Sequence, residues 1–195
     1  MNKLMGFFEL QRMSLPVIPW KEYTGREILA DEMLWTIRSA VFHGDDLNLP
    51  RLVGANSKDA KRFADQLLGR LGDKGIVIFY PYFIANKSGT IEIRQNKIVI
   101  EAVKYDLWNM VTLSHRDVTI QLEGNQEIID GNNQFLSKSE KEQILSNVSE
   151  VRKVFRGELV EGKSILLEWS FAQNCDLEKN PLGDEYLIFY EARTV

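Results

Sequence analysis

The sequence has few of the features that would assign a chain to a function class at once. Its single cysteine, Cys175, cannot form an internal disulfide, so we expect a protein of the cytoplasm. The longest apolar stretch, residues 76–85, contains Pro81 and is much shorter than the roughly 20 residues that a membrane helix needs. No basic cluster stands out, and a net charge of −4 does not suit a protein that neutralises a nucleic-acid backbone. We therefore expect neither a membrane span nor a nucleic-acid partner.

The composition is that of a globular protein with a sizeable core. Of the 195 residues, 44% are hydrophobic and 27% are charged, which suits one domain or two small lobes. At the amino terminus, Glu9 and Gln11 interrupt the apolar residues and no small-residue cleavage site follows, so we expect no signal peptide.

Helical and strand-like patterns follow one another in an order that predicts an α+β fold. Apolar residues recur at helical spacing in residues 57–71 and 137–155, and the second helix begins with the capping-box pattern Ser137-Lys-Ser-Glu140. Between the helices lie strand-like runs joined by short turns, typical of an antiparallel meander, in residues 76–83, 90–94, 97–103 and 118–122. The polar residues 123–134 are expected to form a surface loop. We place a reduced amino-terminal lobe in residues 1–75 and a larger lobe in residues 76–195.

Two further strand-like runs near the carboxyl terminus carry acids where apolar residues would be expected. They are residues 164–172 (SILLEWSFA) and 186–193 (YLIFYEAR), with a polar loop between them. If the two runs pair antiparallel, which so short a connection allows, Glu168 and Glu191 face one another across the pair. Side chains alternate faces along a strand, so Arg193 shares the face of Glu191. Two carboxylates and a guanidinium are therefore expected to meet.

The chemistry of this group predicts a metal–phosphate site. Hard divalent ions such as Mg²⁺ are held by one or two carboxylates together with substrate phosphates, and the guanidinium fork suits phosphate oxygens. Strict alternation also places Glu191 on the face of Leu187 and Phe189. The alternative is an exposed hairpin face with ordinary surface charges.

Taken in order, these segments resemble the ATP-binding domain of the phosphoenolpyruvate synthase and pyruvate phosphate dikinase family, part of the ATP-grasp superfamily. The family's amino-terminal motifs are a glycine-lysine-glycine stretch, NLxEL and GLPVPPG, and they are matched here by Asn2-Lys3 followed by FFELQRMSLPVIP. The family's VRSSATAED motif is matched by IRSAVFHGDD. Its VVVQKMVxSxxSGVxFT resembles residues 76–93, and its IVIEAxxGLGE begins like IVIEAV. Its DIEWAxD and LYLLQARPxT resemble LLEWSFA and YLIFYEARTV. The match covers nearly the whole chain and implies an ATP-grasp-like α+β fold, an antiparallel sheet with flanking helices.

The resemblance implies a set of cations around ATP. Lys3 and Arg38 fall at the family's nucleotide-binding lysine and phosphate-binding arginine, and both would contact ATP phosphates. Arg193 would contact the transferred phosphoryl group, so that Arg38 and Arg193 are the candidate catalytic residues. Cations spread over the phosphate oxygens stabilise the developing negative charge of phosphoryl transfer.

The resemblance also implies a role for three carboxylates. Glu168 and Glu191 would bind Mg²⁺, which agrees with the site expected from the strand pattern. Glu101 would contact the ribose or adenine region of ATP, or else is a sheet residue on a solvated face.

Several positions depart from the family's pattern. Its metal-strand Asp is Leu166 here, its Gln in the final motif is Glu191, and its GLGE is replaced by residues 105–109 (YDLWN). A glycine loop that approaches a ligand closely cannot simply accept Tyr and Trp, because their side chains fill the space. With only His43 and His115, neither in a carrier-like context, we assign no phosphorylated histidine.

The sequence leaves three functions open. The first is an ATP- and Mg²⁺-dependent phosphotransferase, kinase-like in its chemistry, that acts on a small acceptor or a partner protein. The second is a small carboxylate ligase that forms an acyl phosphate, because two glutamates on neighbouring strands suit that class at least as well as Glu plus Gln. The third is a binding or structural module that kept the fold and lost the chemistry, as the lost glycine loop suggests.

Overall fold

The computed structural model describes residues 3–43 and 49–195, without the side chains of Lys3 and of residues 111–113. The chain forms two compact units. Unit 1 comprises Met1–Val17, Ala85–Ala172 and Glu185–Val195, and unit 2 comprises Ile18–Ile84 and Gln173–Asp184. The lobe boundary expected between residues 75 and 76 lies inside unit 2. Sheets whose paired strands run antiparallel, with helices packed on them, confirm the predicted α+β class.

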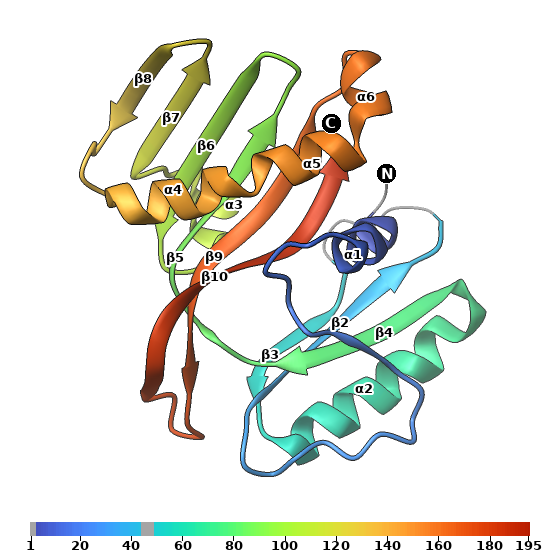
Figure 1. The fold of residues 1–195 in the computed structure, drawn as a ribbon. Coiled ribbons are helices and arrows are strands. Elements are labelled where there is room, and N and C mark those ends of the chain that lie inside the picture. Colours follow the sequence, from blue (N-terminus) through green and yellow to red (C-terminus); the bar gives the residue numbers. More distant parts are fainter. Residues whose placement is uncertain (1–2, 44–48) are drawn as a thin grey trace. The chain divides into compact units, whose positions relative to one another are not determined.

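Unit 2 is a four-stranded sheet with one long helix (Figure 1). In sheet order its strands are β1 (Lys21–Tyr23), β4 (Gly75–Pro81), β2 (Trp35–Val41) and β3 (Arg51–Ala55), paired antiparallel. Helix α2 (Ser57–Leu71) begins where the Asn56 side chain accepts a hydrogen bond from the Asp59 amide, and the 3-10 turn η1 (Gly72–Lys74) follows it. The apolar stripe of α2 packs on Trp35, Ile37 and neighbouring core residues of the sheet.

The packing of α2 predicts a large loss of stability when its stripe is truncated. Leu67 is 2% exposed and lies in the core of unit 2. Leu67→Ala should lower the free energy of unfolding by roughly 2–5 kcal/mol, because the transfer energy is lost and a cavity remains. Urea unfolding measures the loss, with the exposed Gln66→Ala on the same helix as the control. Equal stabilities of the two variants would remove α2 from the core.

Unit 1 is built on a six-stranded sheet, of which residue 84, residues 173–175 and residues 181–184 at the ends of three strands belong to unit 2. In sheet order its strands are β10 (Pro181–Thr194), β9 (Ile165–Cys175), β5 (Ile84–Ile93), β6 (Lys97–Lys104), β7 (Val118–Glu123) and β8 (Gln126–Gly131). Its helices are α1 (Lys3–Arg12), α3 (Trp108–Leu113), α4 (Lys138–Ser146), α5 (Val148–Val154) and α6 (Arg156–Val160). Helices α4 and α5 cross one face of the sheet and α3 lies on the other (Figure 1).

Two expectations for unit 1 are wrong. The region expected as a surface loop, residues 123–134, contains β8, an edge strand whose six residues are all exposed and which pairs antiparallel with β7. The helix expected over residues 137–155 is divided at Asn147 into α4 and α5. The Asn147 side chain donates to the Gln143 carbonyl at 2.7 Å, a local bond that competes with a continuous helix.

The two faces of the large sheet differ in character. One face carries the main core of unit 1, which includes Ile91, Ile100, Leu167 and Trp169 and is closed by residues of α4 and α5. Side chains alternate along each strand, so the intervening residues point the other way. We call that second face the polar face, because it carries Ser88, Thr90, Glu101, Glu168 and Ser170. Helix α3 covers part of it through a small cluster of Val103, Leu107, Met110 and Tyr190.

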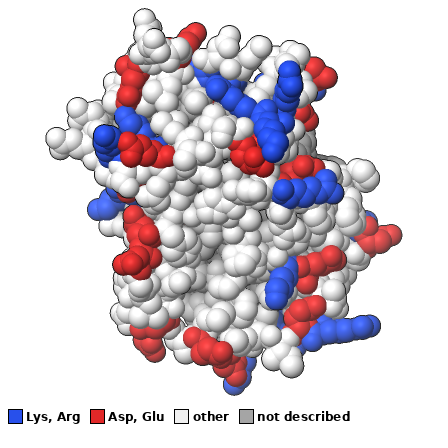
Figure 2. Space-filling model, viewed as in Figure 1, with Lys and Arg blue, Asp and Glu red and all other residues white. Residues whose placement is uncertain are grey.

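Surface charge is mixed on the face of the molecule that Figure 2 shows. Figure 2 shows acidic and basic side chains interspersed on the face in view, with no broad patch of either sign. Among residues 3–43 and 49–195, no helix has the length and apolar character needed to cross a membrane.

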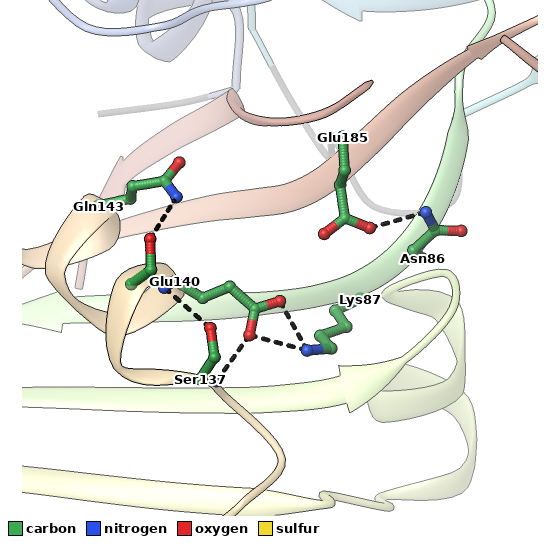
Figure 3. Close-up of polar contacts among 7 residues, drawn as sticks. Asn86, Lys87, Ser137, Glu140, Gln143 and Glu185 are labelled. Carbon is green, nitrogen blue, oxygen red and sulfur yellow. Dashed lines mark hydrogen bonds and ion pairs between the residues drawn. The ribbon is translucent and has the colours of Figure 1, made fainter. Parts of the chain in front are cut away.

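An ion pair links α4 to β5 on the face of the sheet that α4 and α5 cross (Figure 3). The ammonium of Lys87 donates to the two carboxylate oxygens of Glu140, at 2.6 and 2.8 Å. The Glu140 carboxylate also accepts from the Ser137 amide at 2.6 Å, while the Glu140 amide donates to the Ser137 hydroxyl at 3.2 Å. The capping box predicted from the sequence is therefore confirmed, and Lys87 links it to the sheet.

We expect this ion pair to make folding stability depend on pH. Burial raises the pKa of Glu140, but its bonds with Lys87 and Ser137 outweigh burial and hold the pKa below its ordinary value of 4.5. A carboxyl group whose pKa is lowered in the folded state stabilises the fold above its unfolded pKa and loses that contribution as pH falls through the folded pKa. From about pH 7 to about pH 3, the urea midpoint should fall more in the wild type than in Glu140→Gln. Equal falls would contradict this assignment.

Candidate functional site

Two buried glutamates and one arginine meet on the polar face of unit 1. The Nη2 of Arg193 donates to Glu168 Oε1 at 2.7 Å and to Glu191 Oε1 at 2.9 Å. Glu168 is 8% exposed and Glu191 2%, whereas the Arg193 side chain keeps 35% of its surface exposed. Acidic side chains are rarely buried to this degree unless they are paired. The guanidinium therefore helps to hold two carboxylates close together at a place that solvent can reach.

The register of β9 and β10 explains why these residues meet. Ser164 and Val195 exchange both backbone N–H···O bonds, each at 2.9 Å, as in a hydrogen-bonded pair of an antiparallel ladder. Counting an equal number of residues inward from this pair places Glu168 opposite Glu191. The strands bring together the two carboxylates that the sequence pattern placed face to face.

The alternation along β10 is interrupted next to the site. Leu187, Phe189 and Ala192 all belong to the core that α4 and α5 close. The residues of β10 that face this core therefore have odd numbers up to Phe189 and an even number at Ala192. One extra residue in this interval, as in a β-bulge, turns Glu191 and Arg193 toward the polar face. The expectation that Glu191 shares a face with Leu187 and Phe189 is therefore wrong.

Two contacts set the register of β9 against β5. Ser170 Oγ lies 2.8 Å from Ser88 Oγ. The Trp169 ring lies over Gly89 on the opposite face, where an added Cβ would come within 2.4 Å of it. The pairs Trp169–Gly89 and Ser170–Ser88 fit a single antiparallel register. The residue number rises by one along β9 as it falls by one along β5.

This register continues across the polar face as one row of side chains. The next step along β9 and β5 places Glu168 opposite Thr90. Thr90 pairs with Glu101 on β6, and Glu101 pairs with Thr119 on β7. Side chains of directly paired residues point to the same face. The row therefore runs from Glu191 through Glu168, Thr90 and Glu101 to Thr119.

Glu101 lies on the same face as the glutamate pair and is held by an arginine. The Arg116 Nε donates to Glu101 Oε1, and the two side chains are 39% and 26% exposed. No sequence pattern marks Arg116 as a partner of Glu101. The two residues are 15 positions apart with no periodic relation, and only the return of the chain from α3 into β7 brings them together.

The two amino-terminal cations, Lys3 and Arg38, belong to different units. Lys3 begins α1, and its side chain lies outside the described residues. Gly6, about one helical turn later, lies so close to Ala192 that a Cβ there would meet the Ala192 carbonyl oxygen. The first turn of α1 therefore lies beside the strand that carries Arg193. Arg38 belongs to unit 2, where it is half-buried on β2 and pairs with Arg51 on β3, and its position is described within that unit alone.

The segment of residues 105–109 has one glycine-like feature. Tyr105 has a positive φ of 64°, a conformation that side chains rarely adopt and that glycine adopts freely. The Tyr105 ring is 55% exposed and lies 4.7 Å from the Lys104 ammonium, while Trp108 is 48% exposed. Tyr105 therefore has a backbone conformation that favours glycine, and the aromatic side chains of Tyr105 and Trp108 lie at the surface.

The donor set of the site fits one hard cation. Among the described residues, no group of three or more His, Cys, Asp or Glu side chains is placed to hold a metal ion. The site offers two carboxylates, Glu168 and Glu191. Mg²⁺ commonly binds one or two carboxylates and completes its octahedron with water and substrate phosphates. The residues present therefore fit Mg²⁺ that arrives with a phosphorylated ligand.

Comparison with known proteins gives likenesses of fold only. No family model matches the chain, and no curated protein matches it. It is similar to macrocyclase MdnC of Microcystis aeruginosa MRC, solved with precursor peptide MdnA, at 14% identity and a TM-score of 0.47, over 97% of this chain and 51% of that chain. It is also similar to N5-carboxyaminoimidazole synthase of Aspergillus clavatus, solved with ADP and 5-aminoimidazole ribonucleotide, at 11% identity and a TM-score of 0.47, over 98% of this chain and 43% of that chain. The chain spans about half the length of these two proteins.

Proposed function

We propose that the chain is an ATP-grasp-like domain that binds ATP with Mg²⁺ and transfers a phosphoryl group to a small acceptor or a partner protein. The observation that carries the proposal is the cluster of Glu168, Glu191 and Arg193 on the polar face. It joins two carboxylates, which suit a hard cation, to a guanidinium, which suits phosphate oxygens. The resemblance of the surrounding segments to the phosphoenolpyruvate synthase and pyruvate phosphate dikinase family supports the same assignment.

Each charged residue has a separate role in this proposal. Glu168 and Glu191 hold Mg²⁺, which when bound neutralises charge on the phosphate oxygens. Arg193 contacts the transferred phosphoryl group, and Lys3 and Arg38 contact other phosphate oxygens. Because Arg193 already bonds to both carboxylates, it fixes the position of the phosphate relative to the metal ligands. The protein then supplies charge and orientation, and little covalent chemistry is required of it.

The transfer step itself is a substitution at phosphorus. An acceptor oxygen forms a bond to phosphorus while the phosphorus–oxygen bond to the leaving nucleotide breaks, and the nucleotide oxygen keeps the bonding electrons. Negative charge grows on the leaving oxygen and spreads over the transferred group. Cationic groups that face these oxygens lower the barrier, because they bind the transition state more strongly than the ground state.

A carboxylate ligase is the second candidate, and the observation that favours it is Glu191. The resembled family has Gln at this position, whereas two glutamates held together suit ligases that activate a carboxylate as an acyl phosphate at least as well. The two candidates share the site and differ in the acceptor. Release of ADP that requires both a carboxylate and an amine would favour the ligase.

Isothermal titration of the purified protein with ATP, with and without Mg²⁺, tests the proposal. We expect binding that depends on Mg²⁺, because the two carboxylates repel a free triphosphate and attract one that carries a cation. Absence of any binding in the presence of Mg²⁺ would overturn the proposal. The chain would then be a binding or structural module without nucleotide chemistry.

A further inference from the structure

One hydroxyl on the polar face has no part in the function proposed above. Thr90 stands in the row between Glu168 and Glu101, on the central strand of the three that carry these residues. It is half-buried, and among the residues that the structure describes its hydroxyl has no hydrogen-bond partner. The neighbouring hydroxyls of Ser88 and Ser170 are buried and bond to each other at 2.8 Å. Thr90 therefore provides a hydroxyl without a protein partner between Glu168 and Glu101 among the described residues.

The row of side chains from Glu168 to Glu101 determines which residue lies under a ligand that contacts both glutamates. Neighbouring strands lie about 4.8 Å apart, so the backbones that carry Glu168 and Glu101 are separated by about 10 Å, with Thr90 midway. A molecule with its metal-bound phosphates at Glu168 and its ribose at Glu101 crosses the sheet directly above Thr90. Each glutamate has its own guanidinium, Arg193 at one end and Arg116 at the other. Thr90 supplies a neutral donor between these charged ends.

We propose that the Thr90 hydroxyl donates a hydrogen bond to a phosphate oxygen of the nucleoside triphosphate in this site. The inference rests on the proposed function and adds a specific phosphate contact to it. A hydroxyl is suited to this place because two carboxylates flank it. An ammonium here would be drawn to the carboxylates, and a third carboxylate would repel the phosphates. The methyl group of Thr90 restricts its χ1 torsion, which favours one position of the hydroxyl oxygen.

Thr90→Val removes the hydroxyl and keeps the shape of the side chain. We expect the Kd for Mg-ATP, measured by isothermal titration, to rise about tenfold, as for the loss of one hydrogen bond to a charged group. Thr90→Ser restores the donor and should bind Mg-ATP within about threefold of the wild type. Thr119→Val is the matched control, because Thr119 stands in the same row beyond Glu101 and should leave the Kd unchanged.

The outcomes separate this inference from the proposed function. Weaker binding in Thr90→Val alone, with urea midpoints unchanged in all three variants, supports the phosphate contact. Wild-type affinity in Thr90→Val overturns the contact and leaves the proposed function standing. Equal weakening in Thr90→Val and Thr119→Val also overturns it, because the effect would then come from the face as a whole. A wild type that binds no Mg-ATP overturns both.

Discussion

Glu168→Gln should strongly weaken Mg-dependent ATP binding and leave the fold intact. The glutamine side chain has nearly the same shape, and its amide oxygen can still accept the hydrogen bond from Arg193 Nη2, which lies 2.7 Å from Glu168 Oε1. It has no charge with which to hold a divalent cation. We expect the Kd for Mg-ATP to rise by roughly a hundredfold or more, since the loss of one partner of a buried charged pair costs about 2–5 kcal/mol. Titration calorimetry and urea unfolding on the same preparation measure the two properties.

Glu185→Gln is the control for this experiment. Glu185 lies on the same strand, β10, but is exposed and accepts a hydrogen bond from the Asn86 side chain at 2.7 Å (Figure 3). Its removal changes the net charge by the same amount and should leave Mg-ATP binding close to that of the wild type. If Glu168→Gln binds as well as the wild type, the metal assignment is wrong. If both variants lose binding, general electrostatics and not the glutamate pair controls affinity.

Local patterns predicted much of the fold. Helix α2, the strand meander and the capping box at α4 all have signals that lie within a few residues of one another, such as helical apolar spacing and the Ser137–Glu140 pattern. Strand β8 had no such signal. All six of its residues are exposed, so no apolar alternation marks it, and its pairing with β7 depends on a partner strand. The division of the helix at Asn147 depends on one side-chain bond that periodicity does not report.

The candidate site was predictable where it depends on one strand pair. Alternation and a short connection were enough to expect Glu168 beside Glu191 and Arg193. The β-bulge before Ala192 was not expected, because sequence alternation assumes an uninterrupted strand. Thr90 was not singled out either, since its place between Glu168 and Glu101 follows only from the register of three strands that are distant in sequence.

The core beneath the site leads to the largest expected effect on stability. Trp169 is fully buried, and among the described residues it is the largest of the fully buried side chains. Its ring lies over Gly89, whose missing Cβ leaves room for it, and makes an edge-to-face contact with Phe171 at 5.6 Å between centroids. Trp169→Ala should lower the free energy of unfolding by roughly 3–5 kcal/mol, because the cavity opens against the sheet backbone, which collapses little.

Urea unfolding followed by far-ultraviolet circular dichroism measures this loss without relying on the deleted tryptophan. Trp108→Ala is the matched control, because the Trp108 side chain is 48% exposed and its removal should cost less than about 1 kcal/mol. The result also bears on the site. Trp169 over Gly89 is one of the two contacts that set β9 against β5, and the same register places Glu168 opposite Thr90. A loss in Trp169→Ala no larger than in Trp108→Ala would remove the tryptophan from the core, and with it one support for the row of side chains on the polar face.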